Sequence, residues 1–242
     1  GTHVLVEKPI AMNREQAARI TERGRGKGVL VLEAMWTRFL PHMVRLREIL
    51  AAGELGDLRS LIADHGQLLP ADPAHRINDP ALGGGSLLDL GIYPLSFAHE
   101  LFGPPTTTLA TAVISPRGVD TLTSVVQQFA GGEQAVSHFG SDARGPNRAS
   151  VIGTTGRVEI DPVWYSRTSF TRYDADDQVV ERFESDYEGR GMQFQAREAE
   201  RLIRAGSIAS EVITPEESVA IMGTLDAVRE AIGLHYPGLD RP

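Results

Sequence analysis

Residues 83–95 have the sequence GGGSLLDLGIYPL, a glycine loop that leads into an apolar, helix-forming run. Three consecutive glycines let the backbone approach a ligand closely or adopt a positive φ without steric cost. The spacing predicts a helix that begins at Ser86 as N-cap, continues through a capping-box Asp89, and ends at Phe102. Asp89 and Tyr93 are four residues apart, so a helix places them on one face. A carboxylate beside a phenol at this point indicates a proton-handling site.

A purely structural interpretation accounts for the same residues. Asp89 then serves only to cap the helix, Tyr93 occupies an ordinary core position, and the glycines form a turn. The rest of the chain decides between the two interpretations.

The composition is that of a globular protein, because the 242 residues are 41% hydrophobic and 23% charged, with a formal net charge of −8. The negative charge argues against nucleic acid or an anionic membrane as partner, and no apolar run approaches the ~18 residues of a membrane helix. Cysteine is absent, which excludes disulfides and thiol chemistry and fits a cytoplasmic protein. The seven histidines lack ligand-like spacing, so we expect no metal site.

The first 35 residues predict one β-α-β unit. Residues 3–6 and 29–32 are short apolar runs typical of buried parallel strands. Between them, Asn13 is predicted to cap a helix that ends in the glycine-rich residues 24–28. One such unit cannot form a doubly wound sheet, so we expect this segment to be the end of a larger α/β domain.

The remainder of the chain is predicted to be an α+β domain. A helix at 41–52, a strand at 58–65 and a long Pro- and Gly-rich loop at 69–85 come first. Turn residues then divide a β-rich stretch into strands at 108–115, 121–129, 134–141, 148–153, 157–160, 168–173 and 178–183. Two amphipathic helices, at 191–205 and after Thr214, end the chain. Short turns predict a large, mainly antiparallel sheet with the helices on one face.

The other face of this sheet is expected to carry apolar residues. In strands 121–129 and 134–139 both alternating sets are apolar, with Leu122 and Val126 on one set and Val125 on the other. We therefore predict that the open face meets a second copy of the chain. The alternative is an exposed sheet with irregular patterning.

Glu7-Lys8-Pro9 follows the first predicted strand. Ligands of open α/β sheets bind beyond the carboxyl ends of the strands, so Lys8 stands where chemistry is expected. The alternative is a solvated lysine, the commonest state of this residue type.

Residues 3–9 (HVLVEKP) and 83–93 (GGGSLLDLGIY) together resemble the glucose–fructose oxidoreductase, inositol dehydrogenase and rhizopine catabolism (Gfo/Idh/MocA) family. Residues 33–41 (EAMWTRFLP) are similar to one branch of it, the dimeric trans-dihydrodiol dehydrogenases and D-xylose dehydrogenases. Residues 152–158 (IGTTGRV) also resemble the family. Many members have His where this chain has Tyr93, whereas the dihydrodiol branch has Tyr.

The resemblance implies an N-terminal Rossmann domain that binds NAD(P) and a C-terminal α+β domain that supplies the substrate pocket and the dimer interface. Residues 1–35 are then expected to be a remnant of the Rossmann domain, and 36–242 the substrate-binding and dimerisation domain. The glycine fingerprint of the cofactor domain is missing before Lys8. The expectation is therefore a C-terminal portion of a longer protein that is inactive alone. The branch favours NADP over NAD.

The resemblance also implies the site residues. The catalytic set is expected to be Lys8, Asp89 and Tyr93. The expected cofactor-binding residues are Glu7, Lys8, Pro9, Trp36 and Arg38. The expected substrate-binding residues are Lys8, Trp36, Asp89, Tyr93 and Trp164, with Phe194 as a further candidate.

The resulting hypothesis is hydride transfer between a nicotinamide and a hydroxyl or carbonyl of a sugar, polyol or dihydrodiol. A nearby ammonium favours a phenolate, so Lys8 is expected to lower the pKa of Tyr93 from its reference value near ~10. Tyr93 then acts as general acid/base while Asp89 orients Tyr93 or Lys8, and direct proton transfer by Lys8 is the alternative. The competing hypothesis is a non-enzymatic dimerising or sugar-binding module without a cofactor domain.

Overall fold

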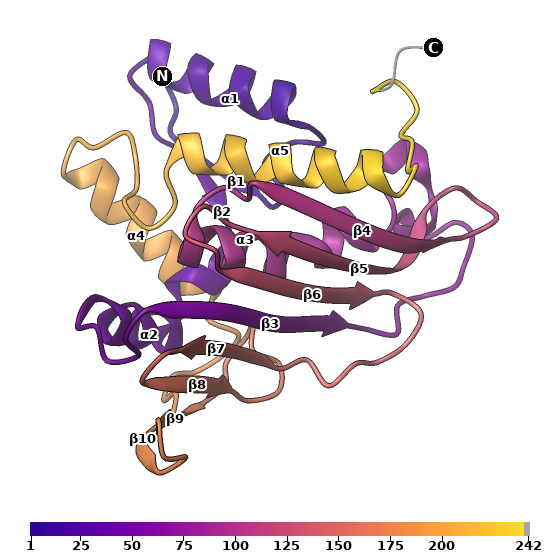
Figure 1. The fold of residues 1–242 in the computed structure, drawn as a ribbon. Coiled ribbons are helices and arrows are strands. Elements are labelled where there is room, and N and C mark those ends of the chain that lie inside the picture. Colours follow the sequence, from indigo (N-terminus) through magenta and orange to yellow (C-terminus); the bar gives the residue numbers. More distant parts are fainter. Residues whose placement is uncertain (240–242) are drawn as a thin grey trace.

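The computed structural model describes residues 1–239 and contains two β-sheets (Figure 1). The smaller sheet pairs β1 (Val4–Glu7) with β2 (Val31–Ala34) in parallel, and α1 (Arg14–Gly26) connects them. The Asn13 side chain accepts a hydrogen bond from the backbone N–H three residues later, as an N-cap does. The predicted β-α-β unit and its cap are confirmed.

The larger sheet has eight strands, β3 (Leu58–Gly66), β4 (Thr107–Ile114), β5 (Asp120–Gln128), β6 (Gln134–Gly140), β7 (Ala149–Gly153), β8 (Gly156–Ile160), β9 (Phe170–Asp174) and β10 (Val179–Phe183). Their order is β10-β9-β8-β7-β3-β6-β5-β4, and only the pairing of β3 with β6 is parallel. The predicted α+β class with a mainly antiparallel sheet is confirmed. The central place of β3 did not follow from the sequence, because its partners β6 and β7 are distant in the chain.

The helical layer consists of α2 (Pro41–Ala51), α3 (Ile92–Phe102), α4 (Met192–Arg204) and α5 (Pro215–Ala231). Of these helices, α3 packs against β3 and β6, and α5 packs against β4 (Figure 1). In β6 the alternate residues Ala135, Ser137 and Phe139 are buried, whereas Val136 and His138 are exposed. The period-2 alternation therefore divides the sheet into a covered face and an open face.

The elements β1, α1 and β2 do not stand apart from the larger sheet. Helix α1 packs along α5 (Figure 1), and the backbone N–H of Arg14 donates to Asp226 Oδ2 at 2.9 Å. Helix α5 begins as predicted, with the Thr214 hydroxyl accepting a hydrogen bond from the Glu217 N–H at 3.0 Å. Packing between α1 and α5 thus fixes the end of β1 relative to the helical layer.

Four short turns complete the fold, namely η1 (Trp36–Phe39), η2 (Arg76–Asn78), η3 (Pro80–Leu82) and η4 (Leu87–Gly91). The single helix predicted for 86–102 is wrong, because η4 is a π-helical turn and α3 begins only at Ile92. The predicted N-cap is also wrong. Ser86 already has helical backbone angles, and its hydroxyl donates to the buried carboxylate of Asp120 at 2.6 Å instead of capping the turn.

The open face of the larger sheet carries a row of apolar side chains across four adjacent strands. Leu109 is paired with Val126, Val126 with Val136, and Val136 with Ile62. Their exposed fractions lie between 41% and 65%. Cross-strand neighbours on one face lie close enough to form a continuous surface, so the face presents an apolar stripe to solvent.

Candidate active site

Lys8 follows β1 directly, and its ammonium contacts both of the other predicted catalytic residues, Asp89 and Tyr93. Its Nζ donates a hydrogen bond to the backbone oxygen of Asp89 at 2.6 Å and lies 3.4 Å from Asp89 Oδ1. The same Nζ lies over the ring of Tyr93, 4.8 Å from the centroid. Asp89 lies in the π turn η4, in which hydrogen bonds join residues five apart. The predicted stacking of Asp89 and Tyr93 on one face of a regular α-helix is therefore not formed. Lys8 supplies the link between them.

Glu33 holds the turn that carries Lys8, a role that the sequence did not reveal. Its buried Oε1 accepts a hydrogen bond from the backbone N–H of Ile10 at 2.9 Å. Burial raises the pKa of Glu33, and hydrogen bonds from the Ser218 hydroxyl and the Ile10 amide oppose this effect. Glu33 is the third residue of β2 and pairs with Val6 of β1, so the parallel pairing places its side chain against the turn.

Arg76 is a second cation at Asp89 that sequence reasoning missed. Its guanidinium donates to Asp89 Oδ1 at 2.9 Å from the exposed side of the site. Burial raises the pKa of Asp89, but the charges of Lys8 and Arg76 outweigh it and hold that pKa below its ordinary value. Burial lowers the pKa of Lys8 and outweighs the opposing effect of Asp89. The site therefore pairs a firmly ionised carboxylate with an ammonium that releases its proton more readily than a free lysine.

Tyr93 is buried among aromatic side chains at the start of α3. Trp36 Nε1 donates a hydrogen bond to Tyr93 Oη at 2.9 Å, and the rings of His65 and Tyr165 lie 4.9 and 5.4 Å from the Tyr93 ring between centroids. Burial raises the pKa of Tyr93 to about 12, although the Trp36 hydrogen bond acts in the opposite direction. The expectation that Lys8 lowers this pKa is wrong, because desolvation dominates at a ring that is only 7% exposed.

His65, near the end of β3, is a third residue that the sequence did not single out. Its ring stacks on Tyr165 with centroids 3.6 Å apart, and its Nε2 lies 2.7 Å from Gln67 Nε2. Burial lowers the pKa of His65 to about 3, and the charge of Lys8 acts in the same direction. His65 is therefore neutral at physiological pH and supports the two tyrosines as an uncharged ring.

At Gly85 the backbone of the glycine loop lies close to the buried carboxylate of Asp120 and not to an open ligand site. Its φ is +104°, and a Cβ there would lie 2.2 Å from Asp120 Oδ1. Asp120 is fully buried and accepts hydrogen bonds from Ser86 Oγ at 2.6 Å and Thr123 Oγ1 at 2.9 Å. Only glycine permits this close approach, which anchors the start of η4 and hence Asp89.

A cavity of about 660 Å³ adjoins Lys8 and Asp89. Glu7, Lys8 and Pro9 form one wall, and Arg76, Gly83 and Asp89 another. Apolar side chains, among them Ile10, Met12 and Leu88, complete the lining. This lining fits one end of a nicotinamide cofactor, which presents a planar ring beside polar sugar and phosphate groups. Trp36 and Tyr93 are not part of the wall, although Tyr93 lies against Lys8 and Trp36 is bonded to Tyr93.

A smaller cavity of about 230 Å³ lies beside Tyr165. It is lined in part by Gln67, Arg144 and Asn147, and Asn147 Oδ1 accepts a hydrogen bond from Tyr165 Oη at 3.2 Å. Val163 on its edge has φ +46°, a strained conformation for a β-branched residue. The cavity is lined by hydroxyl, amide and guanidinium groups. One of its lining residues, Tyr165, packs against Tyr93.

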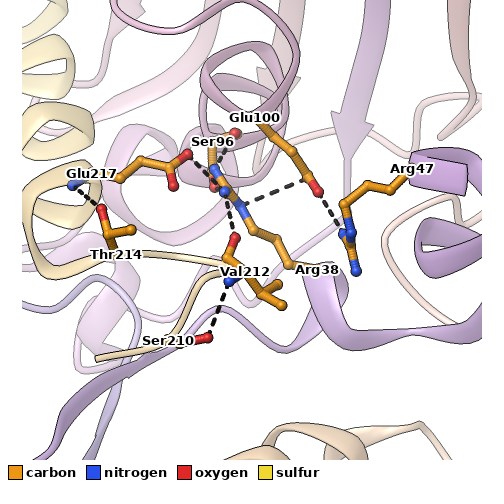
Figure 2. Close-up of polar contacts among 8 residues, drawn as sticks. All are labelled: Arg38, Arg47, Ser96, Glu100, Ser210, Val212, Thr214 and Glu217. Carbon is orange, nitrogen blue, oxygen red and sulfur yellow. Dashed lines mark hydrogen bonds and ion pairs between the residues drawn. The ribbon is translucent and has the colours of Figure 1, made fainter. Parts of the chain in front are cut away.

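Besides Trp36 and Tyr93, three further expected site residues line neither cavity. Arg38 is buried, and its guanidinium bonds within the protein, mainly to Ser96 and Glu217 (Figure 2). Trp164 is fully buried and donates through Nε1 to a backbone oxygen at the end of β3. Phe194 of α4 packs edge-on against Tyr187. The structure brings none of the three to Lys8.

Two classes of site are not found in the described part of the chain. Residues 1–239 contain no group of three or more His, Cys, Asp or Glu side chains placed to hold a metal ion. Within the same residues, no helix combines the length and the apolar character needed to cross a bilayer.

Comparisons with known proteins agree with this geometry. The family profile described as GFO/IDH/MocA C-terminal domain matches residues 43–159. The trans-1,2-dihydrobenzene-1,2-diol dehydrogenase of Bos taurus is 34% identical, in an alignment that covers 98% of this chain and 72% of that relative. The Homo sapiens enzyme of the same name is 32% identical, and the alignment again covers 98% of this chain and 72% of the relative. KijD10, a 3-ketoreductase from Actinomadura kijaniata solved with NADP and TDP-benzene, superposes with a TM-score of 0.82 at 25% identity over 96% of this chain and 71% of its own. The aldose-aldose oxidoreductase from Caulobacter crescentus, solved with glycerol, gives 0.83 at 25% identity over 95% and 70%.

The fold and these relatives together identify an oxidoreductase of the dehydrogenase class. The chain belongs to the Gfo/Idh/MocA family.

Proposed function

We propose that the chain acts in an NAD(P)-dependent oxidoreductase that transfers a hydride between nicotinamide and a hydroxyl or carbonyl of a sugar, polyol or dihydrodiol. The observation that carries the proposal is the Lys8 ammonium, bonded to Asp89 and lying over Tyr93 beside a cavity of about 660 Å³. The relatives support this substrate class, since their names include a dihydrodiol dehydrogenase, a 3-ketoreductase and an aldose oxidoreductase.

Glu7, Lys8 and Pro9 are proposed to contact the nicotinamide end of the cofactor, which supplies or accepts the hydride when bound. NADP is favoured because KijD10 was solved with it. In this proposal residues 1–35 contribute one β-α-β unit to the cofactor domain, and residues 36–242 form the substrate domain. Residues 240–242 lie outside the described structure.

The proton is proposed to move at Tyr93 or Lys8. With a pKa of about 12, the Tyr93 phenol is protonated at neutral pH and can donate to a carbonyl oxygen during reduction. Lys8 stabilises the same oxygen as it gains negative charge, and its lowered pKa makes it the better proton acceptor during oxidation. Asp89 fixes the ammonium through its backbone oxygen and its carboxylate.

Replacement of Lys8 tests the proposal, and the chain offers a matched control because its only other lysine is Lys27. Lys27 is exposed at the end of α1. We expect Lys8→Met to lower kcat by ~10²-fold or more in the complete gene product, and Lys27→Met to leave it unchanged. The assay is steady-state oxidation of NADPH and NADH with a panel of aldoses, inosose-type ketones and dihydrodiols.

An unchanged kcat in Lys8→Met on a substrate that the wild-type protein turns over would contradict the proposed site. Loss of activity in both variants would indicate a general effect of lost positive charge and would also count against it.

The protein is further proposed to be a cytoplasmic homodimer that associates through the open sheet face. The apolar row from Leu109 to Ile62 supports this interface, since exposed contiguous apolar surface marks association sites. The net charge of −8 supports a small-molecule partner over nucleic acid or an anionic membrane, and the absence of cysteine suits a reducing compartment.

A further inference from the structure

The short helix η1 holds three separate parts of the site through three consecutive polar side chains. Trp36 Nε1 donates to Tyr93 Oη at 2.9 Å, and Thr37 Oγ1 donates to the backbone oxygen of Tyr165 at 2.7 Å. Arg38, the third, extends to the other side of α3. A turn of four residues has little stability of its own, so its placement depends on these tertiary bonds.

Arg38 makes the most extensive of these connections (Figure 2). Its Nε donates to Ser96 Oγ at 3.1 Å, and a terminal nitrogen donates to the Ser96 backbone oxygen at 2.6 Å. The other terminal nitrogen donates to Val212 O at 3.1 Å and to Glu217 Oε1 at 2.7 Å. The guanidinium thus joins η1 to α3 and to the start of α5, with the side chain only 3% exposed.

The contact with Ser96 lies one helical turn from Tyr93. Residues three apart on a helix are neighbours on one face, so Arg38 grips α3 close to where Trp36 meets Tyr93. Two bonds from one short turn to one helix fix both the distance and the angle between them. The Arg38–Ser96 contact and the Trp36–Tyr93 hydrogen bond therefore join η1 to the same part of α3.

The charges around Arg38 balance inside the protein. Glu100 Oε2 lies 3.7 Å from Arg38 Nε, and Glu100 Oε1 accepts from Arg47 at 2.5 Å (Figure 2). With Glu217, the cluster contains two arginines and two carboxylates. Arg47 is one-third exposed and bonds to Glu100 from the outer side of the cluster. A planar guanidinium can serve several acceptors at fixed angles, which a lysine cannot do.

We propose that Arg38 is a positioning residue for Tyr93, which clamps η1 against α3 so that Trp36 stays bonded to the Tyr93 hydroxyl. The part of this inference that concerns turnover rests on the proposed function, in which Tyr93 handles the proton. Arg38 touches neither cavity, so its effect on the reaction is exerted through Trp36 and Ser96.

The chain has two tryptophans, which gives the proposal a direct spectroscopic test. In ¹H–¹⁵N spectra of the complete gene product, Trp36→Phe and Trp164→Phe assign the two indole signals. We expect Arg38→Lys to shift the Trp36 indole signal and speed its hydrogen exchange, while the Trp164 signal, whose Nε1 is bonded to a β3 carbonyl, stays in place. We also expect kcat to fall by ~10- to 100-fold with KM nearly unchanged, because small displacements of a catalytic group have effects of this size.

Arg47→Lys is the matched control, because it alters the same charge cluster without touching η1. It is expected to leave both the Trp36 signal and kcat unchanged. An unmoved Trp36 signal in folded Arg38→Lys, or an equal shift in Arg47→Lys, would overturn the proposal.

If Arg38→Lys does not fold, Ser96→Ala tests the proposal instead. This variant removes the hydrogen bond from Arg38 Nε to Ser96 Oγ and keeps the two arginines and two carboxylates of the cluster. A shifted Trp36 signal is expected there too, and an unmoved one would refute the clamp. An active Tyr93→Phe enzyme would refute the proposed function but leave the spectroscopic result standing, so the two failures are distinguishable.

Discussion

Replacing Tyr93 by phenylalanine removes one hydroxyl and keeps the ring among its aromatic neighbours. The ring stays in contact with His65 and Tyr165, so packing is preserved. What is lost is the proton-bearing group and the acceptor of the Trp36 Nε1 hydrogen bond. The variant therefore separates a catalytic role of Tyr93 from a packing role.

The two losses have different sizes. A general acid/base contributes ~10²- to 10⁴-fold to the rate, which corresponds to about 3–5 kcal/mol in the activation barrier. A buried N–H left without an acceptor costs about 1–3 kcal/mol of folding stability. For a protein of this size each kcal/mol lowers Tm by roughly 2–4 °C. We expect a stable, folded Tyr93→Phe protein whose kcat is lower by ~10²-fold or more.

Steady-state kinetics, cofactor binding by NADPH fluorescence and thermal unfolding are measured on the complete gene product. Tyr236→Phe is the control, because it also removes a buried hydroxyl, one that donates to Gly84 O at 3.1 Å. The control is expected to lose stability but to keep kcat within a few-fold. A Tyr93→Phe enzyme with near-normal kcat and an unaltered pH profile would refute the catalytic assignment of Tyr93.

Three further predictions concern single side chains. Asp89→Asn is expected to lower the pKa of Lys8 further, since the carboxylate raises it, and NMR titration of ¹³C-methylated lysines measures the change. If the chain dimerises through the open face as proposed, Val126→Asp is expected to give a monomer by light scattering, whereas Val179→Asp on the edge strand β10 is expected to leave the dimer intact. Burial raises the pKa of Asp120 above the ordinary value for aspartate, so the folded state retains a proton that the unfolded state releases, and stability falls as pH rises above about 4. Asp120→Asn is expected to remove that part of the fall, measured by urea unfolding between pH 4 and ~7.

The elements of the fold were largely predictable because their signals are local. Alternating apolar residues and turn residues located all seven strands from β4 to β10 to within about two residues. The caps at Asn13 and Thr214 located two helix starts, because each side chain bonds to a backbone N–H three residues on. The position of Lys8 followed from the rule for strand ends, and the structure places Asp89 and Tyr93 against it.

What failed depends on contacts between distant parts of the chain. Ser86 has the sequence of an N-cap, but a buried carboxylate from another strand, Asp120, takes its hydroxyl. The pKa of Tyr93 follows from burial by residues that the sequence does not place around it. Arg38 lies in a stretch of family resemblance, yet its partners come from α3 and α5 and hold it inside the protein. None of these partners can be inferred from spacing.

The central position of β3 has a consequence for how the chain folds during synthesis. Both neighbours of β3 are made later, with β6 at residues 134–140 and β7 at 149–153. Until the ribosome has released those segments, both hydrogen-bonding edges of β3 lack their native partners. Unpaired strand edges invite pairing with other chains, and pairings distant in sequence slow folding. A strand at the middle of the finished sheet is therefore the one that waits longest for its partners while the protein is being made.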